Sequence, residues 1–129
     1  MKVLIVALPQ KISKNQFEPL ELAPMAIYLL ASILMKNKHE VSIIDPCEFI
    51  QYEHKGDIEE LCAQYIMKKI SSKDIQLIAF SVNSFNWSNT KVIIQRIADN
   101  FPDVKIALGG LHPSIFDKHV LESSDAHIV

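Results

Sequence analysis

The sequence predicts an α/β fold in which helices cover both faces of a parallel sheet. Short apolar runs rich in Val and Ile alternate with longer segments of helical periodicity along the 129 residues. The apolar runs are continuous, which is typical of strands that are buried on both faces. No repeat, low-complexity segment or linker interrupts this alternation, so the length corresponds to one domain.

Five strands are expected in this doubly wound sheet. They are Lys2 to Leu8, Val41 to Ile44, Gln76 to Val82, Val104 to Leu108, and a last strand that starts at about Ala126. Pro9 ends the first strand, because proline cannot donate to a central ladder. We expect the flavodoxin-like strand order 2-1-3-4-5 with right-handed crossovers.

Four helices connect the strands. They are expected at Pro24 to Asn37, Asp57 to Ser71, Ser88 to Phe101, and Pro113 to Glu122. Pro24 and Pro113 fit the first helical position, where a missing N–H costs nothing. Asp57 is a candidate cap with Glu60 three residues later, and Pro102 ends the third helix.

Apolar residues at helical spacing predict which helix faces are buried. The first helix carries a core-facing stripe of Ile27, Leu30, Ala31 and Leu34. The apolar face of the second helix consists of Ile58, Leu61, Cys62, Tyr65 and Ile66. Cys62 is therefore interpreted as a core residue rather than a nucleophile.

Two connections are harder to interpret. Residues 9 to 23 form a long polar loop, which is either functional or mobile filler. Asp45 follows the second strand, where an acid can bind a ribose in a dinucleotide fold. Because the spaced glycines of that fold are missing after the first strand, Asp45 is interpreted as loop or cap chemistry. The stretch from Glu48 to Lys55 is expected to be solvated surface.

The run Ile106 to Ser114 (IALGGLHPS) is the strongest candidate for a binding element. Two of the three glycines of the chain, Gly109 and Gly110, stand side by side at the end of an apolar strand. Glycines there permit unusual backbone angles and leave room for a ligand, although a plain tight turn is the alternative. In the expected order, the loops Pro9 to Ser13, Ser81 to Trp87 and Gly109 to Ser114 converge on one rim.

Composition and motifs exclude several classes of protein. Hydrophobic residues make up 49% of the chain and the net charge is −2, which disfavours disorder and a nucleic-acid surface. No apolar run has the length of a membrane span and no export signal is evident, so a cytoplasmic location with Cys47 and Cys62 reduced is expected. A P-loop, a receiver-domain set of acids, a serine elbow and a metal-binding cluster are all missing from the sequence.

Three segments together resemble the N-terminal cobalamin-binding domain of radical S-adenosylmethionine (SAM) enzymes. They are APMAIYLLASILMKNKHEVSIIDP (Ala23 to Pro46), IAFSVNSFNW (Ile78 to Trp87) and IALGGLHPS. The resemblance covers nearly the whole chain in the right order. It implies a cobalamin cofactor that lies against the carboxyl ends of the strands, with its nucleotide tail entering the sheet.

The chain also departs from this family and its relatives. Ala26 and Lys38 replace common glycines, and Ala23 stands where a proline is frequent. Related modules carry Asp-x-His-x-x-Gly after the first strand, with the histidine as lower cobalt ligand, but residues 9 to 23 contain no histidine. The three-cysteine motif that binds the 4Fe-4S cluster of the radical SAM domain is missing as well.

The resemblance implies a set of cofactor-binding residues: Pro9, Gln10, Ser81, Val82, Asn83, Ser84, Gly109, Gly110 and His112. The two glycines are expected to let the tail pass, and the polar side chains to donate hydrogen bonds. Gly110 is expected to face the rim. His112 is interpreted as a helix cap or a packing residue, with cobalt ligation as the alternative. No catalytic residue and no protein-bound metal site are expected in this chain.

The resemblance also implies a larger context. The chain is expected to be the N-terminal part of a radical SAM protein, such as a methyltransferase, whose downstream domain binds SAM and a 4Fe-4S cluster. The chain alone is then a binding module without catalytic activity. The alternatives are a degenerate domain that serves only for docking, and a flavin or nucleotide binder on the same fold.

Overall fold

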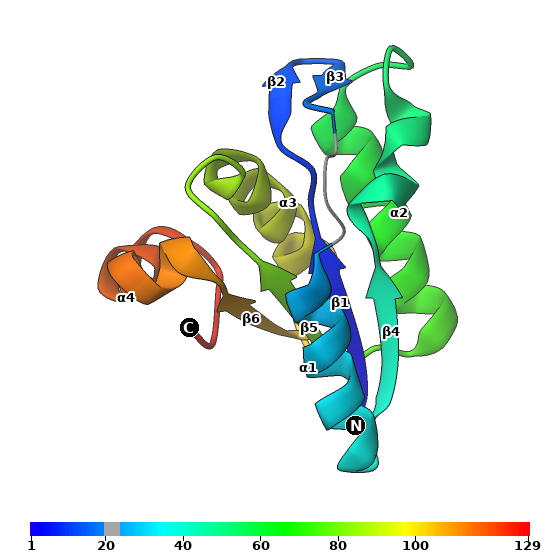
Figure 1. Cartoon of the computed structure of the whole chain (residues 1–129), viewed down its shortest axis with the longest axis vertical. Coiled ribbons are helices and arrows are strands. Elements are labelled where there is room, and N and C mark those ends of the chain that lie inside the picture. Colours follow the sequence, from blue (N-terminus) through cyan, green and yellow to red (C-terminus); the bar gives the residue numbers. More distant parts are fainter. Residues whose placement is uncertain (20–23) are drawn as a thin grey trace.

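The computed structural model describes residues 1–19 and 24–129. The end of the predicted loop and Ala23 lie outside the described residues. A four-stranded parallel sheet has the order β4-β1-β5-β6, which is the predicted order for the first four strands (Figure 1). The strands are β1 (Lys2–Ala7), β4 (Glu40–Ile44), β5 (Leu77–Ser81) and β6 (Lys105–Gly109).

Helices cover the two faces of this sheet unequally. Helices α2 (Ile58–Lys73) and α3 (Trp87–Asn100) lie on one face, and α1 (Met25–Lys36) lies on the other. Helix α4 (Leu111–Ser123) lies beside β6 and contributes Val120 to the core on the α2 and α3 side. Among the described residues, no helix covers the half of the sheet formed by β5 and β6 on the α1 side.

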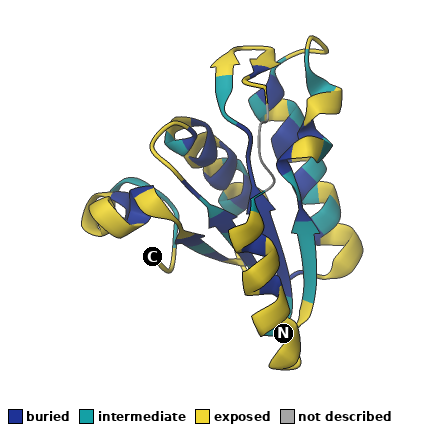
Figure 2. Cartoon of the chain, in the orientation of Figure 1, coloured by how far each residue is buried: buried dark blue, intermediate teal, exposed yellow. Residues whose placement is uncertain are grey.

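The alternating side chains of β1 divide the core into two clusters. Leu4 and Val6 belong to the larger cluster with α2 and α3, whereas Val3, Ile5 and Ala7 pack with α1. All five side chains are buried, which explains the continuous apolar run in the sequence (Figure 2).

The predicted core stripe of α1 is only partly confirmed. Ile27 and Ala31 are buried, but Leu30 is 44% exposed and Leu34 is half-buried. Leu30 lines a hollow over the open half of the sheet. Among the described residues, no second helix packs beside α1 to cover it. Apolar side chains are also exposed on the outer surface of α1, opposite Ile27 and Ala31: Met25, Leu29 and Ile33.

Two predicted loops contain regular structure instead. Residues 9–19 include a hairpin of β2 (Lys11–Ser13) and β3 (Gln16–Phe17), which Phe17 anchors by burying its ring. The stretch that was expected to be solvated surface contains a 3-10 helix, η1 (Pro46–Tyr52). Asp45 caps η1 in a reciprocal capping box with Glu48, which confirms its interpretation as cap chemistry.

The fifth strand is reduced to a single parallel bridge between Ala107 and Ile128. The C-terminal segment does run beside β6, as the predicted order requires. A regular ladder is prevented because the Nδ1 atom of His127 accepts the N–H of Ile106 at 3.2 Å, so this N–H does not pair with a backbone carbonyl. The backbone N–H groups of His127 and Ile128 both donate to the carbonyl of Ile106.

Helix α4 begins earlier than predicted. Its first residue is Leu111 and its N-cap is Gly110, so Pro113 is the third helical residue rather than the first. Proline is tolerated there because N–H groups of the first turn have no partner within the helix.

Helix α2 is capped by Asp57 as predicted, since its carboxylate accepts from the N–H groups of Glu59 and Glu60. None of the described helices has the length and hydropathy needed to cross a membrane.

Candidate cofactor groove

An apolar groove of about 280 Å³ lies on the open half of the sheet, at the carboxyl ends of the strands. Its floor is formed by β1, β5 and β6, and α1 forms one wall. Its lining residues are Ile5, Ala26, Ile27, Leu30, Ala79, Phe80, Ser81, Ala107, Leu108, Gly109 and Gly110. The position agrees with the rule that open α/β sheets bind ligands outside the carboxyl ends of their strands.

Small residues in register create this hollow. Ile5 pairs with Ala79, and Ala79 pairs with Ala107, so two alanines stand side by side on the floor. Two residues further along each strand, Ser81 is opposite Gly109 at the end of the sheet. Among the lining residues, Ser81 is the one with a polar side chain.

Glycine stands at positions 109 and 110 for different structural reasons. A Cβ atom added to Gly109 would meet no atom of the described residues within 4 Å. The fold therefore does not require glycine at position 109, and a side chain there would project into the open end of the groove. This is the feature expected of a backbone that must leave space for a ligand.

Gly110 is required by the fold itself. Its φ of +107° is a conformation that other residues rarely adopt, and an added Cβ would lie 2.5 Å from the carbonyl oxygen of Val82. Gly110 is exposed at the rim as expected, but its conformation and the nearby Val82 backbone leave no room for a side chain. Its α-carbon packs against the backbone of Val82, because the turn after β6 is docked on the loop after β5.

Several of the predicted binding residues come together at this end of the sheet. Ser81, Gly109 and Gly110 line the groove. Val82 connects the two loops, since its N–H donates to the carbonyl of Gly109 at 2.8 Å and its carbonyl accepts from the N–H of His112 at 3.3 Å.

Asn83 and Ser84 make internal contacts in the loop after β5. The side-chain oxygen of Asn83 accepts the N–H groups of Phe85 and Asn86, at 3.0 Å each. Ser84 Oγ lies 3.1 Å from Nδ1 of His112. The oxygens of both side chains are thus already engaged within the protein, although both residues remain exposed.

Pro9 and Gln10 are not brought to the groove. Pro9 lines a separate small pocket with Phe17 and Ile58 on the α2 side. The hairpin that follows is held on the start of α2 by the ion pair of Lys11 with Glu59 at 2.7 Å. The first of the three predicted loops therefore diverges from the other two.

The imidazole of His112 is nine-tenths buried at the start of α4. It stacks on Trp87, with ring centroids 5.2 Å apart and an interplanar angle of 26°, and it also contacts the ring of Phe116 at 4.9 Å. Burial, together with the nearby charge of His119, lowers the pKa of His112 below its ordinary value of 6.5. The ring is therefore neutral at pH 7, and its surroundings support the packing interpretation.

Charge at this rim favours a ligand that carries hydrogen-bond acceptors or negative charge. The N-termini of α1, α3 and α4 have no side-chain cap and no acidic residue in the first turn among the described residues, whereas α2 has both. Uncapped N–H groups carry a partial positive charge. The carboxylate of Asp45 accepts from Cys47 N–H and the Tyr28 hydroxyl, so its oxygens are engaged within the protein.

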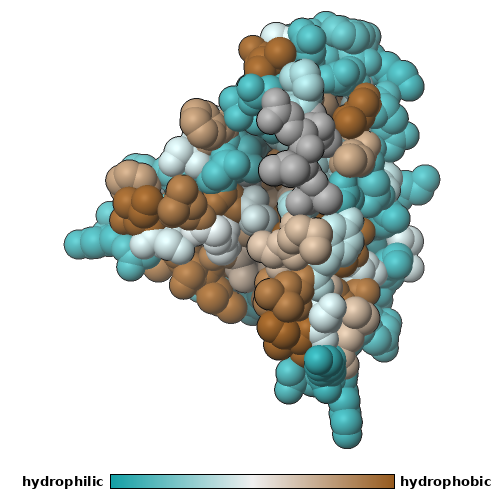
Figure 3. Space-filling model, in the orientation of Figure 1, coloured by the Kyte–Doolittle hydropathy of each residue, from teal (hydrophilic) through white to brown (hydrophobic). Residues whose placement is uncertain are grey.

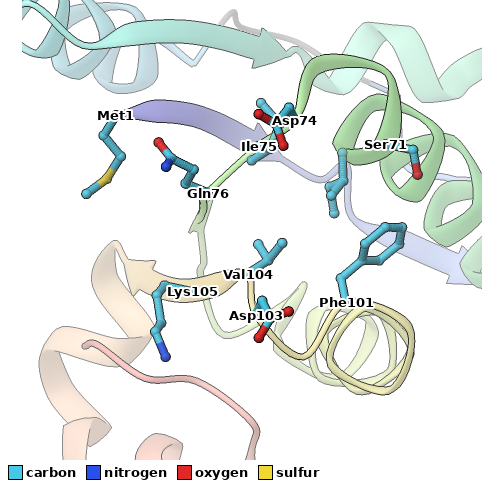
Figure 4. Close-up of a pocket in the computed structure, with 10 residues that line it drawn as sticks. Met1, Ser71, Asp74, Ile75, Gln76, Phe101, Asp103, Val104 and Lys105 are labelled. Carbon is cyan, nitrogen blue, oxygen red and sulfur yellow. The ribbon is translucent and has the colours of Figure 1, made fainter.

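A larger hollow of about 770 Å³ opens at the opposite, amino end of the strands (Figure 4). Asp74, Asp103 and Lys105 stand around it, and helices α2 and α3 end there. Ligand sites in open α/β sheets form at the other end, where helix N-termini and connecting loops meet. The smaller groove is therefore the better candidate despite its size.

No cluster of three or more potential metal-ligating side chains is present in residues 1–19 and 24–129.

The fold and the groove define a parallel α/β domain with a candidate ligand site at the carboxyl ends of its strands. Residues 19–129 match the model of the B12 binding domain family, so the chain belongs to this family of cobalamin-binding domains. The matched range begins after β1 and the β2–β3 hairpin. It therefore leaves out most of the connection at residues 9 to 23, which contains no histidine. Searches of curated proteins and of solved structures found no match.

Sequence reasoning missed the groove floor and its helical wall. Ile5, Ala79 and Ala107 were interpreted only as parts of buried strands, and Ala26 only as a departure from a common glycine. The available signal was the small size of Ala79 and Ala107, which stand at equivalent positions of neighbouring strands. Their register became evident only when the strands were paired.

Proposed function

We propose that the chain binds cobalamin, with the nucleotide tail in the apolar groove and the corrin ring at the rim. Membership of the B12 binding domain family supports the cofactor, and the unoccluded Gly109 position carries the choice of site. A volume of about 280 Å³ is at the small end of ligand pockets, which fits a nucleotide tail better than a whole cobalamin.

The lining chemistry fits the tail. Apolar side chains and the flat surface over Ala79 and Ala107 suit a benzimidazole ring, which buries apolar surface there. Ser81 provides one hydroxyl for a polar group of the tail. The uncapped N-termini of α1, α3 and α4 favour its phosphodiester.

We expect the cobalamin to be bound base-off, without an axial imidazole from the β1–α1 connection. Residues 8 to 24 contain no histidine, and the hairpin within them is tied to α2. The hairpin is also held by the carbonyls of Lys14 and Asn15, which accept N–H groups of Ile58 and His54. Electron spin resonance of the reduced, reconstituted protein tests this expectation, since an axial imidazole adds nitrogen hyperfine splitting.

Titration with hydroxocobalamin, followed by absorbance, tests the proposed site. Gly109→Val adds a branched side chain at the open end of the groove and should weaken binding at least tenfold, with Gly109→Ala intermediate. Lys105→Val is the control, because it places the same side chain on the exposed opposite end of β6. Circular dichroism should show all variants folded.

The outcomes separate the candidate functions. Failure of the folded wild type to bind would favour a degenerate docking domain. Equal binding by wild type and Gly109→Val would refute the groove as the tail site while leaving cobalamin binding intact. Binding of a flavin or nucleotide in place of cobalamin would favour the third alternative.

We further propose that the domain works with a radical SAM domain, as its resemblance to that family implies. Exposed apolar side chains near the rim support a protein partner there: Met25 on α1, Phe85 on the β5–α3 loop, and Leu111, Ile115 and Phe116 on α4 (Figure 3). Such a partner would hold the 4Fe-4S cluster and SAM, and this chain alone would be inactive. The gene should then encode a Cys-x-x-x-Cys-x-x-Cys motif beyond Val129, and a stop codon directly after Val129 would refute this context.

A further inference from the structure

The side chain of His112 joins the two loops that carry the end of the groove. Its Nδ1 atom lies 3.1 Å from Ser84 Oγ on the β5–α3 loop, and its ring stacks on Trp87 at the start of α3. His112 itself belongs to the first turn of α4, two residues after Gly110. One side chain thus connects the glycine turn with the loop that follows Ser81.

The two nitrogen atoms of this imidazole are unequally placed. Nδ1 is engaged with Ser84, whereas Nε2 is fully buried and has no hydrogen-bond partner among the described residues. The ring of Phe116 lies against the imidazole where α4 departs from helical geometry. A buried nitrogen that solvent does not reach is poorly placed to ligate cobalt.

We propose that His112 is a positioning residue that clamps the glycine turn to the β5–α3 loop through Ser84, and that it is not a cobalt ligand. The clamp adds a side-chain connection to the backbone bonds of Val82, next to the paired Ser81 and Gly109 at the open end of the groove. Its consequence for cobalamin affinity rests on the proposed function, but the clamp itself is a property of the free protein.

Burial explains why a hydrogen bond matters at this position. Packing between Trp87 and Phe116 alone would be served as well by phenylalanine, which leaves no orphaned nitrogen. What histidine adds is the bond to Ser84. Ser84 is exposed, so water can satisfy its hydroxyl when the bond is lost. His112→Phe should therefore remain folded while the two loops lose their side-chain hydrogen bond and keep the backbone bonds of Val82.

The clamp can be tested without ligand, because Trp87 is the single tryptophan of the chain. Acrylamide should quench Trp87 fluorescence more strongly in Ser84→Ala and in His112→Phe than in the wild type. Ser84→Thr keeps the hydroxyl and should restore the wild-type value. Unchanged quenching in both disruptive variants would overturn the proposal, whether or not the protein binds cobalamin.

Hydroxocobalamin titration tests the functional consequence. Each single variant should weaken binding about fivefold, which is the effect of one neutral hydrogen bond, and the double variant should be no weaker than either. Losses of affinity that add up in the double variant, or unchanged affinity in the single variants, would overturn the coupling between Ser84 and His112. Nitrogen hyperfine splitting that disappears in His112→Phe but persists in Ser84→Ala would make His112 a cobalt ligand and refute the proposal. If the wild type does not bind, the proposed function fails and the fluorescence result still decides the clamp.

Discussion

Replacement of Gly110 by alanine should destabilise the domain strongly, although it adds only one methyl group. The backbone at Gly110 has φ +107° and ψ −172°, a region that is almost exclusive to glycine. Forcing another residue into such a region costs about 1–3 kcal/mol. The added Cβ would also stand 2.5 Å from the carbonyl oxygen and 3.0 Å from the nitrogen of Val82.

This overlap cannot be relieved by a side-chain rotation. Both polar atoms of the Val82 backbone are held, one by Gly109 and the other by His112. Overpacking of this kind adds about 1–3 kcal/mol, so the expected total is about 2–6 kcal/mol. A domain of this size has a total stability of about 5–15 kcal/mol, so the loss is a large fraction of it.

Urea unfolding followed by far-ultraviolet circular dichroism measures this loss. Gly110→Ala should shift the midpoint to much lower urea with little change in slope. Gly109→Ala is the matched control, and its stability should stay within about 1 kcal/mol of the wild type, because its Cβ meets open space. Equal midpoints for Gly110→Ala and the wild type would refute the assigned conformation of the glycine turn.

Three further predictions follow from ionisable groups. The native protein should expose one accessible thiol, Cys47, because Cys62 is buried and burial raises its pKa to about 12; rapid reaction of both thiols with a disulfide reagent before unfolding would contradict this. Burial lowers the pKa of His112, so the unfolded chain binds more protons and stability should fall as the pH drops from 6.5 toward the lower folded pKa. The melting temperature of the wild type should therefore fall relative to that of His112→Phe over this range, and parallel pH profiles would argue against a neutral, buried imidazole. Burial acts to raise the pKa of Asp45, but the hydrogen bonds from Tyr28 and from the Cys47 N–H outweigh it and leave the pKa lowered. The stabilisation of the fold by the Asp45 carboxylate is therefore present at neutral pH and lost in acid. Asp45→Ala removes the cap of η1 and should cost about 1 kcal/mol in urea unfolding at pH 7, and an unchanged midpoint would show that the cap contributes nothing.

Local pattern was enough to predict most of the architecture. Continuous apolar runs indicated strands buried on both faces, and helical spacing located the four helices, because both signals report burial at the scale of one element. The order of the first four strands is confirmed, and so is the capping role of Asp45 and Asp57. The quoted segments also indicated a cobalamin-binding domain, which agrees with the matched family.

The structure of the connecting segments could not be predicted from local sequence pattern in the same way. The hairpin at Lys11–Phe17 depends on Phe17 reaching a core that other segments build, and its polar sequence carries no strand signal. The fifth strand became a bridge because the His127 side chain takes the N–H of Ile106. Such long-range contacts are invisible to periodicity.

For the site, the sequence by itself determined that glycine, serine and histidine stand at the ends of two strands. Only the tertiary structure decided what each does. The direction of a missing Cβ depends on the backbone angles and on the neighbouring loop, so Gly109 opens the groove while Gly110 packs against Val82. Register between strands aligned Ala79 with Ala107 to form a floor, and folding drew Pro9 away toward α2. These outcomes depend on distances between segments that are remote in the chain, and one-dimensional order does not contain those distances.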